Sequence, residues 1–439
     1  RLEIWGAVPA RCRVLVQVRP ESTGSVQKLD VTLADEAGVA CVRLSGFSTR
    51  VLETISATQK EAATLRWVPA WEAVPAEAST NATYGLHLVF TADRLLADAL
   101  QAQRPEVQVV RLRGEGSDAA RYEAHAQQLL AQVQGVMAGR PEGRVLLQVL
   151  VRGEAERLTV AGLGGLLKSL RQEQPQLLGQ LVWTDTDAEV SAVAEVLDAA
   201  ASVAATEAEV RGTAEGLERA CLLEQALTAT ESGWREGGVY LITGGAGGLG
   251  RLVAAHLAAT VPGVRLVLTG RQTAGAAVAE QLEALQMQGA SASYVAVDVT
   301  DTTAVRSLVA EIVAEHGTLD GVIHSAGVLR DGLALTKSPE DVSAVLGAKV
   351  AGVAALDAAT AALPLSAFVL FSSTASVLGN VGQTDYAGAN AYLDAFGAWR
   401  EAAVACGERQ GRTRVVNWPL WAEGGMQVPA AVVERMRRG

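Results

Sequence analysis

A glycine-rich stretch at residues 243–250 limits the possible folds of this chain more than any other part of the sequence. It runs Thr-Gly-Gly-Ala-Gly-Gly-Leu-Gly, after the apolar run Val239–Thr243 and before the helical pattern Leu249–Ala258. Glycines at such a turn let the backbone approach a pyrophosphate, whose charge meets the amide groups at the helix start. A plain tight turn is the alternative, but the strand–turn–helix context is the one that dinucleotide binding requires.

Strand-like and helix-like patterns alternate regularly over residues 237–439, which predicts βαβ units around a parallel sheet. The expected strands are Val239–Thr243, Arg265–Leu268, Ser293–Val297, Asp320–His324, Ala367–Phe371 and Arg414–Trp418. The expected helices are Leu249–Ala258, Ala277–Met287, Thr303–His316, Pro339–Thr360 and Thr384–Ala405. A similar alternation without a glycine-rich loop spans residues 65–232, with strand-like runs at Leu86–Phe90, Val107–Leu112, Val145–Val151 and Gln180–Thr184. We therefore expect an α/β fold with two Rossmann-like subdomains.

The N-terminal residues follow a different pattern. Residues 14–52 alternate as short strands around a turn at residues 34–38, and a polar stretch at 56–64 is typical of a linker. We expect a short β-rich segment at residues 1–55, a linker to about residue 64, and subdomains at 65–232 and 237–439. Because the sequence begins with Arg1 and has no leader pattern, we expect a piece of a longer protein.

Composition excludes several classes of protein. The 439 residues carry a net charge of −11, whereas a nucleic-acid-binding protein needs a basic face. No uninterrupted apolar run reaches the roughly 18 residues of a membrane span. Four scattered cysteines without CxxC spacing argue against both a disulfide framework and a zinc site. We expect free thiols, no metal, no membrane and a cytoplasmic location.

The ends of the next two strands indicate which dinucleotide binds. Arg271 follows the second strand, where a carboxylate would favour NAD and an arginine favours the 2′-phosphate of NADP. Asp298 and Val299 close the third strand, where the carboxylate is placed for the adenine amine. A solvated Arg271 and an Asp298 that only caps the strand end are the alternatives. We predict NADPH as the cofactor.

Three polar residues converge further along the chain. Ser372 and Ser373 follow a buried strand, Tyr386 lies 13 residues after Ser373, and Asn390 lies four residues after Tyr386. Residues four apart share one face of a helix, so Tyr386 and Asn390 are expected to point into one site. Each alone has a structural explanation as a cap or a core residue.

This combination resembles the short-chain dehydrogenases/reductases, and within them the ketoreductase domains of modular polyketide synthases. The family's H-x-A-G turn matches residues 324–327, and its helical lysine matches Lys349, 37 residues before Tyr386. General short-chain reductases place the lysine four residues after the tyrosine, whereas here Asn390 stands there, as in the polyketide family. The resemblance implies that twelve residues bind the cofactor: Thr243, Gly244, Gly245, Gly247, Gly248, Leu249, Gly250, Arg271, Asp298, Val299, Ala326 and Gly327.

The resemblance also implies a mechanism of ketone reduction. Tyr386 supplies a proton to the developing alkoxide, and Ser373 hydrogen bonds the carbonyl oxygen. A free tyrosine has a pKa near ~10, and we expect the ammonium of Lys349 to bring it closer to neutral pH. Asn390 orients Lys349 or a relaying water. We interpret His324 as structural rather than catalytic.

Residues on the substrate side are matched in the same way. Leu329 and Asp331 fit the L-x-D fingerprint of B-type reductases, which form a D-configured hydroxyl, with Arg330 where many members have Asp. The opposite type has Trp eight residues before the tyrosine, where this chain has Leu378. Gln383, Trp421 and Met426 complete the expected substrate side.

The rest of the chain resembles other parts of these synthases, most closely those whose acyltransferases act in trans. Residues 162–175 (GLGGLLKSLRQEQP) resemble a helix and turn of the structural subdomain, and residues 31–52 resemble the end of a dehydratase hot-dog domain without its catalytic motif.

Expected partners are an acyl carrier protein that bears a phosphopantetheine-tethered β-ketoacyl chain, and the neighbouring ketosynthase and dehydratase. The family continues past Gly439, so we expect an incomplete lid. The alternative function is a catalytically silent scaffold that binds nucleotide or docks neighbouring domains.

Overall fold

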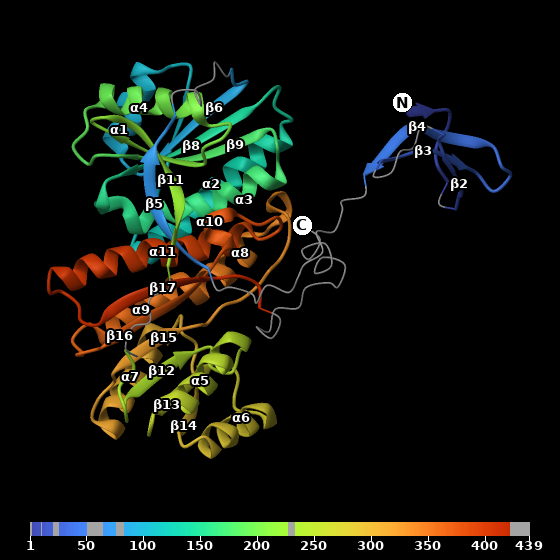
Figure 1. The fold of residues 1–439 in the computed structure, drawn as a ribbon. Helices are drawn as coiled ribbons and strands as arrows, with labels where there is room; N and C mark the ends of the chain where they lie inside the picture. The colour runs from blue at the N-terminus through green and yellow to red at the C-terminus, as the bar shows by residue number, and fades with distance from the viewer. Residues whose placement is uncertain are drawn as a thin grey trace. The chain divides into compact units, whose positions relative to one another are not determined.

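The computed structural model describes residues 2–9, 11–20, 26–50, 65–75, 83–226 and 233–421 (Figure 1). These residues divide into two compact units, and the second begins at Arg66. The first unit is an antiparallel sheet in the order β1-β4-β3-β2, and residues 35–38 form the turn between β3 and β4. Its strands are β1 (Leu2–Ile4), β2 (Arg13–Val18), β3 (Val26–Ala34) and β4 (Ala40–Arg50). The expected linker at residues 56–64 lies outside the described residues.

The first subdomain of the second unit (residues 66–226) is built on a seven-stranded sheet in the order β5-β11-β10-β9-β8-β6-β7. The run β7-β6-β8-β9-β10 is parallel, and β11 and β5 continue the sheet in antiparallel pairing. Its strands are β5 (Arg66–Ala73), β6 (Leu86–Thr91), β7 (Gln108–Arg111), β8 (Val145–Arg152), β9 (Leu177–Thr184), β10 (Glu209–Thr213) and β11 (Gly216–Gln225). Its helices are α1 (Arg94–Gln103), α2 (Asp118–Ala138), α3 (Leu163–Glu173) and α4 (Val190–Val203).

The second subdomain (residues 233–421) contains a six-stranded parallel sheet in the order β14-β13-β12-β15-β16-β17. Counted within the subdomain, this is the order 3-2-1-4-5-6 of a Rossmann fold. Its strands are β12 (Val239–Thr243), β13 (Arg265–Gly270), β14 (Ser291–Ala296), β15 (Gly321–His324), β16 (Ala367–Ser373) and β17 (Arg412–Trp418). Its longer helices are α5 (Gly248–Thr260), α6 (Ala276–Met287), α7 (Thr302–His316), α8 (Pro339–Leu346), α9 (Gly352–Thr360) and α11 (Thr384–Ala405). The prediction of an α/β fold with two Rossmann-like subdomains is confirmed.

The helix expected over residues 339–360 is interrupted in the middle. A π-helical turn, Gly347–Ala351, separates α8 from α9, so Lys349 stands on a widened turn rather than on a regular helix. The stretch Pro339–Thr360 is apolar enough, with a mean hydropathy of 1.6, to cross a membrane by length and composition alone. However, 61% of its most apolar window is buried within the protein. A core helix of a folded domain can be equally long and apolar, so this stretch is weak support for a membrane span.

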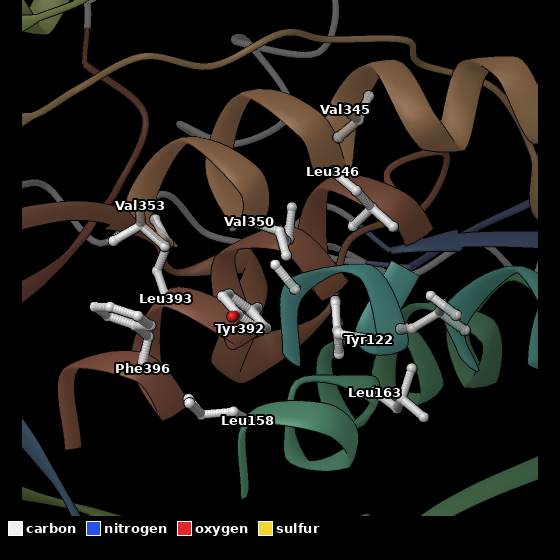
Figure 2. Close-up of a cluster of buried hydrophobic side chains, with 14 of the residues drawn as sticks. Tyr122, Leu158, Leu163, Val345, Leu346, Val350, Val353, Tyr392, Leu393 and Phe396 are labelled. Atoms are coloured by element: carbon white, nitrogen blue, oxygen red, sulfur yellow. The ribbon is translucent and has the colours of Figure 1, made fainter. Parts of the chain in front are cut away.

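One hydrophobic core joins the two subdomains around α11. The ring of Tyr122 from α2 packs 4.8 Å from the ring of Tyr392 on α11, and its hydroxyl donates to the carbonyl of Gly388 at 2.8 Å (Figure 2). Two glycines of the 162–175 motif allow this approach. A Cβ at Gly165 would lie 2.4 Å from the carbonyl oxygen of Ala387, and one at Gly162 would lie 2.8 Å from the amide of Tyr392. α11 is therefore held by residues of both subdomains.

Because this core is continuous, residues 66–421 are expected to unfold as one cooperative unit. Leu393 is fully buried in it, and Leu393→Ala should lower the free energy of unfolding by about 2–5 kcal/mol. Urea unfolding followed by circular dichroism and tryptophan fluorescence should show one transition that shifts as a whole. The control Leu95→Ala, at a side chain 79% exposed on α1, should change the free energy of unfolding by less than about 0.5 kcal/mol. Two transitions, of which Leu393→Ala moves one, would contradict a shared core.

Candidate active site

The glycine-rich loop between β12 and α5 is packed too closely for side chains. Gly244 has a φ of +65°, and a Cβ there would lie 2.9 Å from the backbone of Ala326. A Cβ at Gly250 would lie 2.4 Å from the carbonyl oxygen of Gly244. The residue at the start of α5, Gly247, offers no side-chain cap to the first amides of the helix. Those amides need acceptors from elsewhere, so the loop suits an anionic group such as a pyrophosphate.

A cavity of about 430 Å³ opens beside this loop, at the carboxyl ends of the strands. Strand order reverses between β12 and β15, which is where ligands bind in open α/β sheets. Six of the predicted cofactor residues line the cavity: Gly244, Arg271, Asp298, Val299, Ala326 and Gly327. The other six, Thr243, Gly245, Gly247, Gly248, Leu249 and Gly250, form the end of β12, the turn and the start of α5. The residues present therefore fit a dinucleotide.

Arg271 and Asp298 occupy the rim of this cavity. Oδ1 of Asp298 accepts hydrogen bonds from the backbone amide and the hydroxyl of Thr300, at 2.9 and 2.8 Å. These bonds, with a smaller contribution from the charge of Arg271, lower the pKa of Asp298. Asp298 is thus an ionised residue that caps its own turn, as the alternative interpretation expected, while it also lines the cavity. Arg271 is exposed beside it.

The four predicted catalytic side chains meet at the end of β16. The ammonium of Lys349 lies 5.9 Å from the centre of the Tyr386 ring. Asn390 stands one turn after Tyr386 on α11, and its Nδ2 donates to the carbonyl of Tyr386 at 2.7 Å. Ser373 is the last residue of β16, and its hydroxyl accepts from the amide of Ala375 at 3.2 Å. Segments of the chain up to 41 residues apart thus contribute to one cluster.

Lys349 is buried, with 4% of its surface exposed. Its ammonium donates to the carbonyl of Phe371 at 2.8 Å, which fixes it beside the end of β16. Burial lowers the pKa of Lys349 to about 8, against a smaller opposite effect of the Asp394 charge. The group therefore exchanges its proton near physiological pH, which an exposed lysine does not do.

Tyr386 corrects one expectation from the sequence. We predicted that Lys349 lowers the pKa of this phenol, but burial raises it, and hydrogen bonding by Ser373 and Asn390 offsets only part of the effect. The physical reason is that a buried phenolate loses the hydration that stabilises its charge. Tyr386 is consequently protonated at neutral pH, the form that a proton donor needs.

Asn390 presents an unpaired acceptor to the same cluster. Its side chain is fully buried, and no donor among the described residues lies within hydrogen-bond distance of its Oδ1. Buried polar atoms in native proteins nearly always have a partner, so this oxygen calls for a donor such as a bound water. The role of Asn390, to orient Lys349 or a relaying water, stays a prediction.

One carboxylate that supports the cluster, that of Asp394, was not predicted from the sequence. Asp394 accepts from the hydroxyl of Ser376 at 2.5 Å and from Nδ2 of Asn417 at 2.9 and 3.0 Å. Burial raises the pKa of Asp394, and these hydrogen bonds lower it in part. A sequence signal existed: Tyr386, Asn390 and Asp394 are spaced four residues apart on one helix face. Asp394 thereby ties α11 to the last strand and to the turn after Ser373.

The predicted substrate-side residues come together in part. Gln383 donates from Nε2 to Oδ1 of Asp331 at 3.1 Å, and Leu329 stands two residues earlier in the same loop. Trp421 is 42% exposed, and its ring meets the ring of Trp418 edge-on at 5.3 Å. Met426 lies outside the described residues.

His324 serves the framework of the site. Its Nδ1 is 2.7 Å from the hydroxyl of Thr243, and full burial, followed by the charge of Lys349, lowers its pKa to about 3. It is therefore neutral at working pH and joins the ends of β12 and β15. Within residues 2–421, so far as they are described, no cluster of three or more histidine, cysteine or acidic side chains is arranged to hold a metal.

Comparisons with known proteins agree with this geometry. The KR domain family matches residues 238–423. The crystal structure of a ketoreductase domain from the bacillaene assembly line is 34% identical, with a TM-score of 0.79, and the match covers 85% of this chain and 88% of that one. This chain belongs to the ketoreductase domains of polyketide synthases. It is accordingly an oxidoreductase of the short-chain dehydrogenase/reductase superfamily, with a nucleotide-binding site.

Curated relatives of this ketoreductase are far longer proteins. Polyketide synthase PksN of Bacillus subtilis (strain 168) is 35% identical over 422 residues, which is 94% of this chain and 8% of that protein. Polyketide synthase PksL of the same strain is 35% identical over 418 residues, which is 94% of this chain and 9% of that protein. The chain thus spans less than a tenth of the length of these two relatives.

The close packing of the loop predicts the effect of one added methyl group. Gly250→Ala in this ketoreductase should weaken dinucleotide binding more than about tenfold, because its Cβ would collide with Gly244 and push the loop out of shape. Fluorescence titration with the reduced dinucleotide measures the effect. Gly135→Ala, in α2 with nothing within 4 Å of the new Cβ, is the matched control and should bind normally. Normal binding by a folded Gly250→Ala variant would contradict the assigned loop.

Proposed function

We propose that this chain is an NADPH-dependent ketoreductase that reduces a β-ketoacyl chain on an acyl carrier protein to the β-hydroxyacyl form. The observation that carries the proposal is the cluster of Tyr386, Ser373, Lys349 and Asn390 beside the dinucleotide cavity. A scaffold that only docked neighbours would have no need of a desolvated lysine and an unpaired buried amide oxygen in the same place.

Tyr386 is the proton donor in this proposal. Its raised pKa keeps the phenol protonated until an alkoxide develops on the substrate. Its Oη then gives its proton to that oxygen, while the hydroxyl of Ser373 donates a hydrogen bond to the same atom. Both donors are held in place before the reaction, so little reorganisation is needed when the charge appears.

Lys349 and Asn390 restore the proton. With a pKa of about 8, the ammonium of Lys349 loses its proton more readily than an exposed lysine does. The proton passes toward the Tyr386 oxygen, directly or through a water that donates to Oδ1 of Asn390. Asp394 holds the surrounding turn and strand in place without touching the substrate.

NADPH is the cofactor that the cavity residues favour. The loop amides would hold its pyrophosphate, Asp298 its adenine, and Arg271 the 2′-phosphate that distinguishes it from NADH. When bound, NADPH supplies the hydride. The ammonium of Lys349 lies 3.8 Å from a Cβ built at Gly327, which lines the cavity, so Lys349 would also contact the nicotinamide ribose.

For the product we propose the B-type outcome, a D-configured β-hydroxyl. Leu329 and Asp331 carry the fingerprint, and the hydrogen bond from Gln383 gives Asp331 a fixed position. Leu378 stands where the opposite type has tryptophan, and it is 62% exposed. Trp421 and Met426 remain proposed contacts of the acyl chain.

We also propose that residues 1–55 belong to a neighbouring synthase domain, the end of a dehydratase. Three valines of β2, Val14, Val16 and Val18, are each more than half exposed, as expected for strands that pack against a larger partner. The ketosynthase and the acyl carrier protein are further proposed partners. All four cysteines are free, which suits the cytoplasmic location that we propose.

The proposal predicts that Tyr386→Phe abolishes reduction and leaves NADPH binding intact. The variant removes the proton donor and no contact to the cofactor, so we expect a loss of about 100-fold or more in kcat. Oxidation of NADPH by a β-ketoacyl thioester measures activity, and fluorescence titration measures binding. Reduction at the wild-type rate would remove Tyr386 from the mechanism. A wild type that binds NADPH and never reduces would favour the silent scaffold.

Lys349 predicts the pH dependence of the reaction. Its pKa is about 8, so its proton is lost as pH rises through that value, and kcat for reduction should fall above it. In Lys349→Arg the charge persists to high pH but the guanidinium does not release its proton, so the variant should have a lower kcat and no decline near pH 8. Profiles of kcat against pH for both proteins test this. A wild-type profile that is flat to pH ~10 would contradict the assignment.

A further inference from the structure

Glu173 makes an unusual set of contacts across the two subdomains. It is the last residue of α3, in the first subdomain, but its carboxylate binds three donors of the second. Its Oε1 accepts from the amide of Gly382 at 2.9 Å and from the hydroxyl of Thr384 at 2.8 Å. Its Oε2 accepts from the amide of Ala334 at 2.7 Å. One side chain thus joins two loops that are about 50 residues apart in the sequence.

Those two loops carry the residues assigned to the substrate side. The first runs from Leu329 through Asp331 to Ala334, and the second runs through Gln383 into the helix of Tyr386. The loops also bind each other: the amide of Gly332 donates to the carbonyl of Gly382 at 2.9 Å. The hydrogen bond between Gln383 and Asp331 adds to this contact, as does the ammonium of Lys337, which donates to the carbonyl of Arg330 and to Asp385. The carboxylate of Glu173 therefore ties both loops to the first subdomain at once, whereas Gln134 binds only the first loop and Ser169 only the second.

Electrostatics supports a specific role at this position. An anion at the end of α3 meets the negative end of that helix, which is unfavourable. The same carboxylate lies at the start of α11, where the positive end of the helix favours it. The side chain of Gln383, the residue before α11, makes no cap hydrogen bond of its own. Glu173 thus adds, from another subdomain, a second carboxylate at the start of the Tyr386 helix, beside Asp385 of its first turn.

We propose that Glu173 is a positioning residue for substrate binding and for the configuration of the product. By holding both loops, it fixes the Asp331–Gln383 pair relative to Tyr386, and so the orientation in which the β-keto group meets the proton donor. This inference rests on the proposed ketoreductase function. Glu173 itself contacts none of the reacting groups assigned above, so it acts through the loops.

Glu173→Gln tests the proposal with almost no change in shape. Three donors now meet one acceptor and one amino group, so at least one loop faces a repulsive contact. We expect the KM for the β-ketoacyl thioester to rise about tenfold and the share of the minor hydroxyl epimer to increase. The KM for NADPH should stay unchanged, because the glycine loop is elsewhere. Thr384→Val, which removes one donor of three, should have an intermediate effect.

Gln172→Ala is the matched control on the same helix. The side chain of Gln172 also crosses between subdomains, donating to the carbonyl of Leu378 at 2.7 Å, but binds neither loop amide. It should leave KM and product configuration as in the wild type. Glu173→Gln could instead lower kcat and raise the KM values for both substrates to the same extent, together with a lower Tm. That result would mean that Glu173 only stabilises the fold, and it would overturn the proposal.

Hydrogen exchange separates this proposal from the proposed function. In Glu173→Gln, peptides that cover residues 329–337 and 378–385 should exchange faster, while the loop at 243–250 should exchange as before. Unchanged exchange in both segments overturns the positioning role, whether or not the wild type reduces anything. If these segments exchange faster in Glu173→Gln but the wild type reduces no β-ketoacyl thioester, the proposed reaction is wrong. The role of Glu173 in product configuration is then wrong as well.

Discussion

The packing of α11 between the two subdomains is the interaction on which the rest of this structure depends. The helix presents small residues to the first subdomain, where Gly162 and Gly165 let the backbones approach. That contact buries Tyr392 and Leu393 in the shared core. This packing fixes the position of Tyr386, Asn390 and Asp394, which share one face of α11, at the end of the second sheet. A subdomain without a phosphate loop of its own thus serves the site by fixing this helix.

Burial then gives the polar cluster its chemistry. Removing Lys349 from water lowers its pKa to about 8, and removing Tyr386 from water raises the pKa of the phenol. The two shifts bring a phenol that stays protonated close to an ammonium that can resupply its proton, and no described residue donates a hydrogen bond to Oδ1 of Asn390 nearby. The π-helical turn at Gly347–Ala351 belongs to the same arrangement, because it carries Lys349.

Much of this could be predicted from the sequence, because strong local patterns encode it. The strands and helices of residues 237–421 follow hydrophobic periodicity, and the glycine loop follows its turn context. Lys349, Ser373, Tyr386 and Asn390 were found by spacing and by resemblance to a family. The structure brings all four together, while their roles stay predictions.

What the sequence did not reveal depends on contacts between distant segments. Glu173 gives no local signal, because its three partners lie about 160 to 210 residues further along the chain. The direction of the Tyr386 pKa shift was also beyond sequence analysis, since it depends on how deeply the phenol is buried. Asp394 is a different case, because its spacing from Asn390 was visible and was not interpreted. The interrupted helix at Lys349 shows that periodicity alone does not distinguish a π-helical turn from a regular one.

The most direct test of the proposed function is chiral analysis of the product that the protein forms with NADPH from a β-ketoacyl chain on an acyl carrier protein. The account predicts a β-hydroxyacyl product with the D configuration. A folded protein that binds NADPH and forms no such product would contradict the claim that this cluster reduces a β-keto group. A product with the L configuration would leave reduction intact and contradict the assigned roles of Leu329 and Asp331.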